Sequence, residues 1–285
     1  MNYRHSFHAG NHADVLKHIV LLELLRLLTV KDKPLAYFES HAGAGGYALS
    51  GDAEKTSEWR EGIGRLWNVK DAPSAVEHYL AVVRSWNENG VVLHRYPGSP
   101  GLAAHALRAH DRLVLCENQP DVAAELAHRL AGHDARVRVL RADGYQQALK
   151  ALLPPTERRG LVLIDPPYET QHAEFGLILT ALGEALKRFA TGVYAIWYPI
   201  KRATDIAPFL RALGQLPAKS IFAVELWIRA PDSPLRLNGS GIAVVNPPWP
   251  FATDTLDWLP WLSEQLSAGR GAGCQCRWLK REAQT

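Results

Sequence analysis

The strongest constraint on the fold is a regular alternation of short apolar runs with helix-like segments. Seven apolar runs have the length of strands, at residues 35–40, 112–117, 136–141, 161–165, 192–198, 220–228 and 241–246. Helical patterns lie between them at residues 120–132, 143–153, 174–190 and 205–216. Strands alternating with helices form βαβ units, which predicts an α/β fold with a mainly parallel seven-stranded sheet. The last two runs have only a short polar connection, so the last strand is expected to be antiparallel.

One segment, residues 51–95, interrupts this alternation. It contains two helix-like stretches, at about residues 56–67 and 75–88, and no clear parallel strand. Its six Lys/Arg and seven Asp/Glu do not make it a basic patch. We predict a helical insertion subdomain at 51–95, which could dock RNA or only pack, inside a domain formed by residues 1–50 and 96–285. This domain is expected to begin with an arm and a helix that Asn11 caps.

Composition excludes several classes of protein. Hydrophobic residues make up 47% of the chain and charged residues 21%, as in ordinary globular proteins. Three cysteines form no disulfide framework, and no apolar run approaches the roughly 18 residues of a membrane span. We therefore expect a cytoplasmic protein with no membrane partner. A net charge of +3 permits a nucleic-acid partner without arguing for one.

Glycines and acids follow the first four strands. A glycine-rich turn with Gly43 and Gly45 comes after the first strand, and Glu117, Asp143 and Asp165 end the next three. All fall on the carboxyl edge of the sheet, where open α/β sheets bind ligands. The turn alone is weak evidence, but an acid after the second strand can accept hydrogen bonds from both hydroxyls of a ribose.

The turn differs from a dinucleotide fingerprint because the insertion, not a helix, follows it. The missing helix is expected to begin at Ser99, as N-cap, with Pro100 at its first position, and its free N–H groups could hold a carboxylate. This pattern is typical of an S-adenosylmethionine site. The ribose is expected on Glu117, the adenine near Asp143 and the methionine end over the glycine turn.

The stretch LVLIDPPYET, residues 161–170, gives this site a chemistry. The exocyclic amino group of a base is a poor nucleophile because its lone pair is delocalised into the ring. The carboxylate of Asp165 and the carbonyl of Pro166 can each accept one N–H and aim the lone pair at a sulfonium methyl. Proline fixes φ and so holds that carbonyl, and Tyr168 offers a ring on which the base can stack. Asp165 is expected to orient the amine and to take its proton late. The alternative is a strand followed by a rigid turn.

A second segment, Asn246-Pro247-Pro248-Trp249, fits the same pattern. It follows the strand expected to be antiparallel, so it should lie at the opposite edge of the sheet. We interpret NPPW as a strand terminator and DPPY as the site. The Lys280-Arg281 tail is expected to fray.

Four histidines, His5, His8, His12 and His18, lie in the first 18 residues together with Asp14. Their spacing fits no compact zinc pattern, and no cysteine lies nearby. We expect no metal, and an arm and helix packed near the cofactor and the incoming base.

The run YRHSFHAGNHADVLKH, followed in order by HAGAGG, YPGSP, ADG, LIDPPY, WYP and NPPW, closely resembles the RlmJ family of 23S ribosomal RNA adenine-N6 methyltransferases. The resemblance runs from Tyr3 to beyond Trp249 and implies a Rossmann-like class I methyltransferase domain with a small helical insertion. It implies Asp165 as catalytic residue, His18, His41, Ser99, Glu117, Asp143 and Gly144 as cofactor contacts, and Tyr3, His5 and Lys17 on the substrate side.

Two rival functions stay open at this point. A DNA adenine methyltransferase would usually need a larger target-recognition region than this insertion provides. A non-enzymatic RNA-binding module would have no reason to place acids at three successive strand ends. We expect a monomer that acts on 23S ribosomal RNA free of ribosomal proteins and converts S-adenosylmethionine to S-adenosylhomocysteine.

Overall fold

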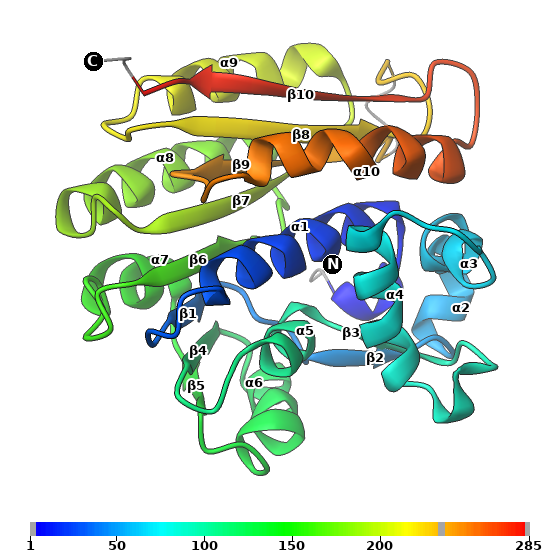
Figure 1. The fold of residues 1–285 in the computed structure, drawn as a ribbon, viewed down its shortest axis with the longest axis horizontal. Coiled ribbons are helices and arrows are strands. Elements are labelled where there is room, and N and C mark those ends of the chain that lie inside the picture. The colour runs from blue at the N-terminus through cyan, green and yellow to red at the C-terminus, as the bar shows by residue number, and fades with distance from the viewer. Residues whose placement is uncertain (1–3, 233–236, 283–285) are drawn as a thin grey trace.

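The computed structural model describes residues 4–232 and 237–282. Within them, eight strands form a central sheet in the order β10-β8-β9-β7-β6-β1-β4-β5 (Figure 1). The strands of this sheet are β1 (Ala36–Glu39), β4 (Arg112–Glu117), β5 (Val137–Arg141), β6 (Gly160–Ile164), β7 (Val193–Ile200), β8 (Ile221–Trp227), β9 (Gly239–Val245) and β10 (Gly273–Lys280). All seven predicted strands are confirmed.

Strand directions follow the prediction, with one addition. The neighbours β5, β4, β1, β6 and β7 are parallel, and β9 is antiparallel to both β7 and β8. The addition is β10, an eighth strand antiparallel to β8. Cys274, Cys276 and Trp278 alternate along it and pack against one hydrophobic core, so the period-two pattern of this strand was overlooked. The prediction that Lys280 frays is wrong, because its Nζ donates to the carbonyl of Leu216 at 2.7 Å.

Helices cover both faces of the sheet. They are α1 (His12–Thr29), α2 (Asp52–Thr56), α3 (Ile63–Leu66), α4 (Ser74–Ser85), α5 (Ser99–Ala106), α6 (Pro120–Leu126), α7 (Gly144–Gln146), α8 (Gln171–Arg188), α9 (Ala203–Gly214) and α10 (Phe251–Leu266), with short 3₁₀ turns η1 (His5–Phe7), η2 (Glu58–Glu61) and η3 (Glu88–Gly90) and π-helical turns η4 (Ala127–Ala131) and η5 (Gln147–Ala151). Adjacent β1 residues Tyr37 and Phe38 point to opposite faces, one into each of two hydrophobic cores. The core around Tyr37 takes α1, α5, α6 and α10, and the core around Phe38 takes α8 and α9.

Helix α10 was not predicted. Pro260 lies in its interior, where a proline removes a helix hydrogen bond, so it argues against a helix when the sequence is read alone. Its buried face, with Trp258, Leu259 and Leu262, packs into the core that also contains α1. Tertiary burial of this face therefore outweighs the local cost of the proline.

The segment 51–95 is helical, as predicted, and two short strands flank it. Strands β2 (Gly46–Ala48) and β3 (Arg95–Pro97) pair antiparallel at its two ends. Its first predicted helix is divided, because Ser57 has a φ of 54° and Gly62 lies outside the helical region. Tyr79 and Leu80 of α4 join the core that contains α1. The domain boundaries themselves stay a prediction.

Asn11 caps α1 as expected, because its side chain accepts the N–H groups of Ala13 and Asp14 at 3.0 Å. The cap fixes where α1 begins, and Lys17 and His18 therefore fall on its second turn. Among the described residues, no helix is long and apolar enough to cross a membrane.

Candidate active site

The carboxyl ends of the parallel strands open into a cavity of about 760 Å³. Residues predicted for the site that line it are His5, Lys17, His18, His41, Gly43, Ser99, Glu117, Asp143, Gly144, Asp165 and Pro166. Gly45 and Tyr168 do not line it, and Tyr3 lies outside the described residues. The structure thus brings together side chains that are more than 140 positions apart in the sequence.

The glycine turn after β1 is held by the acid that ends β4. The N–H of Gly43 donates to Oε2 of Glu117 at 2.9 Å, and Gly43 has a φ of 63°. A Cβ on Gly43 would lie 2.4 Å from the hydroxyl of Tyr47, and the positive φ would strain any larger residue there. Gly45, at a φ of 76°, faces away from the cavity, where a Cβ would meet Leu126 at 2.8 Å.

Behind this turn lies a buried acid, Glu39, at the end of β1. The hydroxyls of Ser99 and Tyr37 both donate to its carboxyl group. Burial raises the pKa of Glu39 to about 8, even though these hydrogen bonds favour the ionised form. Ser99 is the first residue of α5 and Gly98 its N-cap, so the prediction of Ser99 as N-cap is wrong. The side chain of Ser99 turns to Glu39 instead of to the helix N–H groups.

Two histidines of the wall are held neutral by burial. Burial lowers the pKa of His18 to about 3, and its Nδ1 lies 2.8 Å from the hydroxyl of Tyr96. Among the described residues, Nε2 of His18 has no hydrogen-bond partner, although it is buried. Burial also lowers the pKa of His41, whose Nδ1 lies 2.9 Å from the hydroxyl of Ser40.

Asp143 and Gly144 follow β5 and begin α7. One carboxylate oxygen of Asp143 accepts the N–H groups of Tyr145 and Gln146, so this acid also caps a helix. Position 144 requires glycine because the backbone of Ser40 passes close to it. A Cβ at this position would lie 1.9 Å from the carbonyl oxygen of Ser40. The loops after β1 and β5 therefore touch at the wall of the cavity.

Asp165 ends β6 and meets a lysine from the opposite side of the cavity. Nζ of Lys17 lies 2.6 Å from Oδ2 of Asp165 and 2.8 Å from Oδ1 of Asp14. Burial alone would lower the pKa of Lys17, but the two carboxylates raise it well above its usual value, and Lys17 is a full cation. The resemblance implies a place for Lys17 on the substrate side, and no pattern in the sequence predicts its pairing with Asp165.

Tyr168 has a different environment from the one expected for a stacking ring. Its hydroxyl donates to the carbonyl of Trp197, and its ring packs edge-on against Phe175 and Trp197 at centroid distances of 5.6 and 5.4 Å. Only 8% of the residue is exposed. Tyr168 here anchors the DPPY turn to the end of β7, and its stacking role stays a prediction.

The N-terminal histidines separate into different environments. Nε2 of His5 lies 3.0 Å from Oδ2 of Asp14, whereas Nδ1 of His8 lies 2.9 Å from Glu58 of the insertion. His12 is buried, which lowers its pKa to about 4. Across residues 4–232 and 237–282, no group of three or more His, Cys, Asp or Glu side chains could hold a metal ion.

Sequence reasoning missed several residues in the wall of this cavity and behind it. Asp14, which the sequence marks only as a neighbour of the N-terminal histidines, and Glu39, at the end of β1, are buried behind the wall and do not line the cavity. Tyr145 and Glu174 line the cavity and share a hydrogen bond of 2.5 Å, yet nothing in their spacing marks them. The one usable signal was the i, i+3 spacing of Asp14 and Lys17, which puts both on one face of α1.

Comparisons with known proteins agree with this geometry. A family model described as "Ribosomal RNA large subunit methyltransferase D, RlmJ" matches residues 32–280. The chain is 43% identical to ribosomal RNA large subunit methyltransferase J of Haemophilus influenzae, over 99% of this chain and 100% of that protein. It is 45% identical to the Escherichia coli protein of the same name, over 95% and 96% of the two chains.

A solved structure from Legionella pneumophila, of protein LPL1258, superposes with a TM-score of 0.85 at 39% identity. The match covers 95% of this chain and 98% of that one. The family model spans most of the chain, and the relatives are similar over nearly their full lengths. The chain therefore belongs to the RlmJ family of ribosomal RNA large subunit methyltransferases.

Proposed function

We propose that this protein transfers a methyl group from S-adenosylmethionine to the N6 amino group of an adenine in 23S ribosomal RNA. The adenine would be unpaired or flipped out of a helix, because its amino group must reach the floor of the cavity. The observation that carries the proposal is the position of Asp165, at the carboxyl edge and inside the cavity that the glycine turn and Glu117 also line.

The chain offers a fitting cradle for the cofactor. Gly43 leaves room for close approach to the backbone, and the buried Nε2 of His18 is a polar atom without a partner among the described residues. Each oxygen of Glu117 accepts one backbone N–H, so lone pairs are left for ribose hydroxyls. His18, His41 and Ser99 would hold the methionine end, and Asp143 and Gly144 the adenine end. When bound, the cofactor supplies a methyl group on a positively charged sulfur.

Asp165 and Pro166 would hold the amine. Lys17 occupies Oδ2 of Asp165, and among the described residues Oδ1 accepts no hydrogen bond. Oδ1 is therefore the atom for one N–H of the amine, and the carbonyl of Pro166 accepts the other. The fixed φ of Pro166 keeps the two acceptor oxygens in a constant geometry. The turn therefore loses little conformational entropy when the amine binds.

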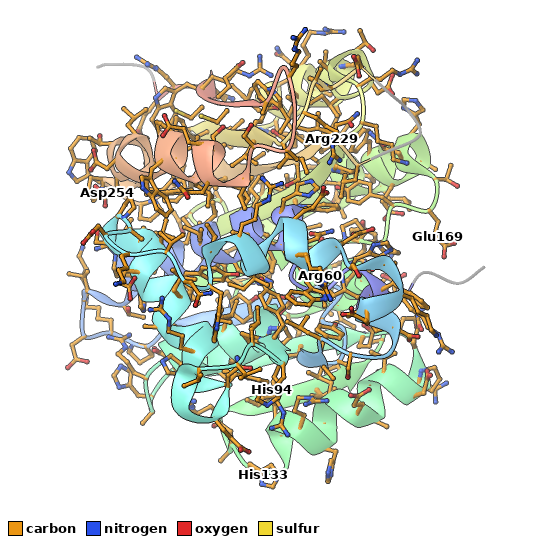
Figure 2. The ribbon with its side chains drawn as sticks, turned by 90° about the vertical axis from the view of Figure 1, so that its right-hand side faces the viewer. Arg60, His94, His133, Glu169, Arg229 and Asp254 are labelled. Carbon is orange, nitrogen blue, oxygen red and sulfur yellow. The ribbon has the colours of Figure 1, made fainter. Side chains whose placement is uncertain are left out.

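We assign RNA docking to the side of the molecule at the carboxyl edge of the sheet, which includes the insertion. Figure 2 labels Arg60 of the insertion and Arg229 of the β8–β9 connection on one side of the molecule. Arg229 lies 3.1 Å from Glu61, so the two segments are joined there. Replacing Arg60 with Gln is expected to weaken RNA binding and to reduce its salt dependence, whereas simple packing predicts no change in either.

A transfer assay tests the function. The protein is incubated with labelled S-adenosylmethionine and protein-free 23S RNA, duplex DNA or assembled large subunits, and the product nucleoside is identified. We expect N6-methyladenosine in protein-free 23S RNA. Transfer only to DNA would favour the rival methyltransferase, and transfer to no RNA would overturn the proposal.

A further inference from the structure

A buried cluster of charges joins α1 to the DPPY turn. Lys17 bridges two carboxylates, with Nζ 2.8 Å from Asp14 and 2.6 Å from Asp165. Asp14 and Lys17 are 2% and 3% exposed, so solvent screens these charges weakly. Removing one charge from such a cluster changes the electrostatic balance of those that remain.

Asp14 has no access to a substrate. It is not among the residues that line the cavity, although Lys17 and Asp165 are. Its second oxygen, Oδ2, accepts the N–H of Gly10 at 2.9 Å and lies 3.0 Å from Nε2 of His5. Asp14 therefore joins the arm to Lys17, and any effect on chemistry must pass through these neighbours.

The reaction makes the charge of the cluster important. The acceptor nitrogen uses its lone pair to form the new C–N bond, and the electron pair of the broken C–S bond stays on sulfur. The positive charge thus moves to the nitrogen beside Asp165, until that nitrogen loses a proton to Asp165 or to water. A cluster with a net negative charge stabilises this change, and a neutral cluster does not.

The charge count depends on every titratable group around Lys17. Facing it are His5 from the arm, Asp14 and His18 from α1, Glu39 from β1, Tyr47 from β2 and Asp165 after β6. Burial keeps His18 neutral, with a pKa of about 3, and Glu39 largely protonated at pH 7, with a pKa of about 8. The two carboxylates and the ammonium that they share carry a net charge of −1 between them.

We propose that Asp14 is a positioning residue for methyl transfer, which holds Lys17 beside Asp165 and supplies the second negative charge of the cluster. Without it, Lys17 and Asp165 cancel, and the ammonium opposes the positive charge that forms on the acceptor nitrogen. This inference rests on the proposed function.

The test uses charge changes that separate this role from a structural one. Asp14→Asn is expected to lower kcat by about 10- to 100-fold, the size expected for one unit charge across several ångströms of protein. The KM for S-adenosylmethionine should stay within about twofold, because Asp14 does not line the cavity. Asp14→Glu, which keeps the charge, should retain more activity than Asp14→Asn.

Glu23→Gln is the matched control, because Glu23 is a buried carboxylate on the same helix that pairs with Arg26. It should leave kcat unchanged. The double variant Asp14→Asn/Lys17→Met restores a net charge of −1, and it should be more active than Asp14→Asn alone. A purely structural role predicts instead that the losses of the two single variants multiply.

A pH profile gives a second readout. In Asp14→Asn, Lys17 keeps one carboxylate partner, so burial lowers its pKa and the ammonium loses its proton as the pH rises. The kcat of this variant should therefore recover with rising pH more steeply than that of the wild type. Thermal denaturation checks that each variant is folded.

Two results would overturn the inference while the proposed function stands: an active wild type with Asp14→Asn equal to Glu23→Gln, or a double variant weaker than either single variant. If Asp14→Asn fails to fold, Lys17→Met is compared with the double variant instead. Because Asp14 acts through Lys17, the double variant should lose no more activity than Lys17→Met alone. A wild type inactive on every RNA would overturn the proposed function, and this inference with it.

Discussion

Two Pro-Pro turns, at opposite edges of the same sheet, differ in what their polar side chains do. In DPPY, Asp165 faces the cavity, pairs with a buried lysine and keeps one oxygen without a hydrogen-bond partner among the described residues. In NPPW, every polar group of the Asn246 side chain is occupied. Its Oδ1 accepts the N–H of Lys219, and its Nδ2 donates to the carbonyls of Ala190 and Gly192.

The aromatic residues of the two turns also differ in their exposure to solvent. Tyr168 is packed against β7, whereas 88% of Trp249 is exposed. The antiparallel pairing of β9 with β7 confirms the prediction that NPPW lies at the edge opposite the cavity. Four similar residues therefore give an acid that faces the cavity at one edge and a fully hydrogen-bonded amide at the other, and strand direction decides which.

The largest difference between the two turns is expected when the polar side chain of each is replaced. Asp165→Asn keeps the shape but replaces one acceptor oxygen by a donor, so we expect methyl transfer to fall by about 1,000-fold or more. Asn246→Ala is expected to retain activity within about threefold, since it lies at the other edge. Single-turnover transfer to 23S RNA measures both.

Folding of Asn246→Ala is followed by urea denaturation, because the lost side-chain hydrogen bonds and a φ of 52° both disfavour alanine there. A loss of about 1–3 kcal/mol is expected from the broken hydrogen bonds. If folded Asn246→Ala were inactive and Asp165→Asn active, the two turns would have exchanged roles.

Strand identity and direction could be predicted because they depend on local periodicity and connection length. For the candidate site, the position of a residue at the cavity could be predicted where that residue ends a strand. This is the case for Glu117, Asp143 and Asp165. Asp14 and Glu39 could not be predicted, because their importance lies in burial and in partners that are distant in the sequence. Helix α10 was missed for the opposite reason, since its local signal is poor and its stability comes from packing.

The next effect in size concerns the aromatic residues. Tyr168→Ala is expected to lower the free energy of unfolding by about 3 kcal/mol, because it leaves a cavity among Phe175 and Trp197. Trp249→Ala should change it by less than about 0.5 kcal/mol, because the side chain is exposed. Urea denaturation measures both. Equal losses would contradict the contrast between the two turns, and Tyr168→Phe should cost only about 1 kcal/mol for its hydroxyl.

A smaller difference comes from Glu39, the buried acid at the edge of the sheet that holds the cavity. Glu39 has a folded pKa of about 8, above its ordinary value of 4.5, so the folded state holds a proton that the unfolded state releases. Stability is then fully present below pH 4.5 and is lost as the pH rises through 8. Glu39→Gln should remove about 2 kcal/mol of this decline between pH 6 and pH 8, measured by urea denaturation. Asn246→Gly is the control: it changes no titratable group, so it should lower stability by the same amount at both pH values. If the stability of Glu39→Gln fell with pH as steeply as that of the wild type, Glu39 would not be the group that causes the decline.

The smallest effect separates the two ends of a single strand. Glu117 ends β4 at the cavity, and Arg112 begins β4 at the opposite edge, where it pairs with Glu157 at 2.7 Å. Glu117→Gln turns one acceptor oxygen into a donor and weakens its hold on Gly43, so the Kd for S-adenosylmethionine should rise by about tenfold. Glu157→Gln breaks the ion pair with Arg112 and should leave this Kd unchanged, although it lowers stability slightly. Isothermal titration calorimetry compares them, and an equal rise in Kd for both variants would show that the cofactor responds to general loosening of β4. A rise confined to Glu117→Gln would place the ribose contact at the carboxyl end, because both changes turn a carboxylate that holds one end of β4 into an amide.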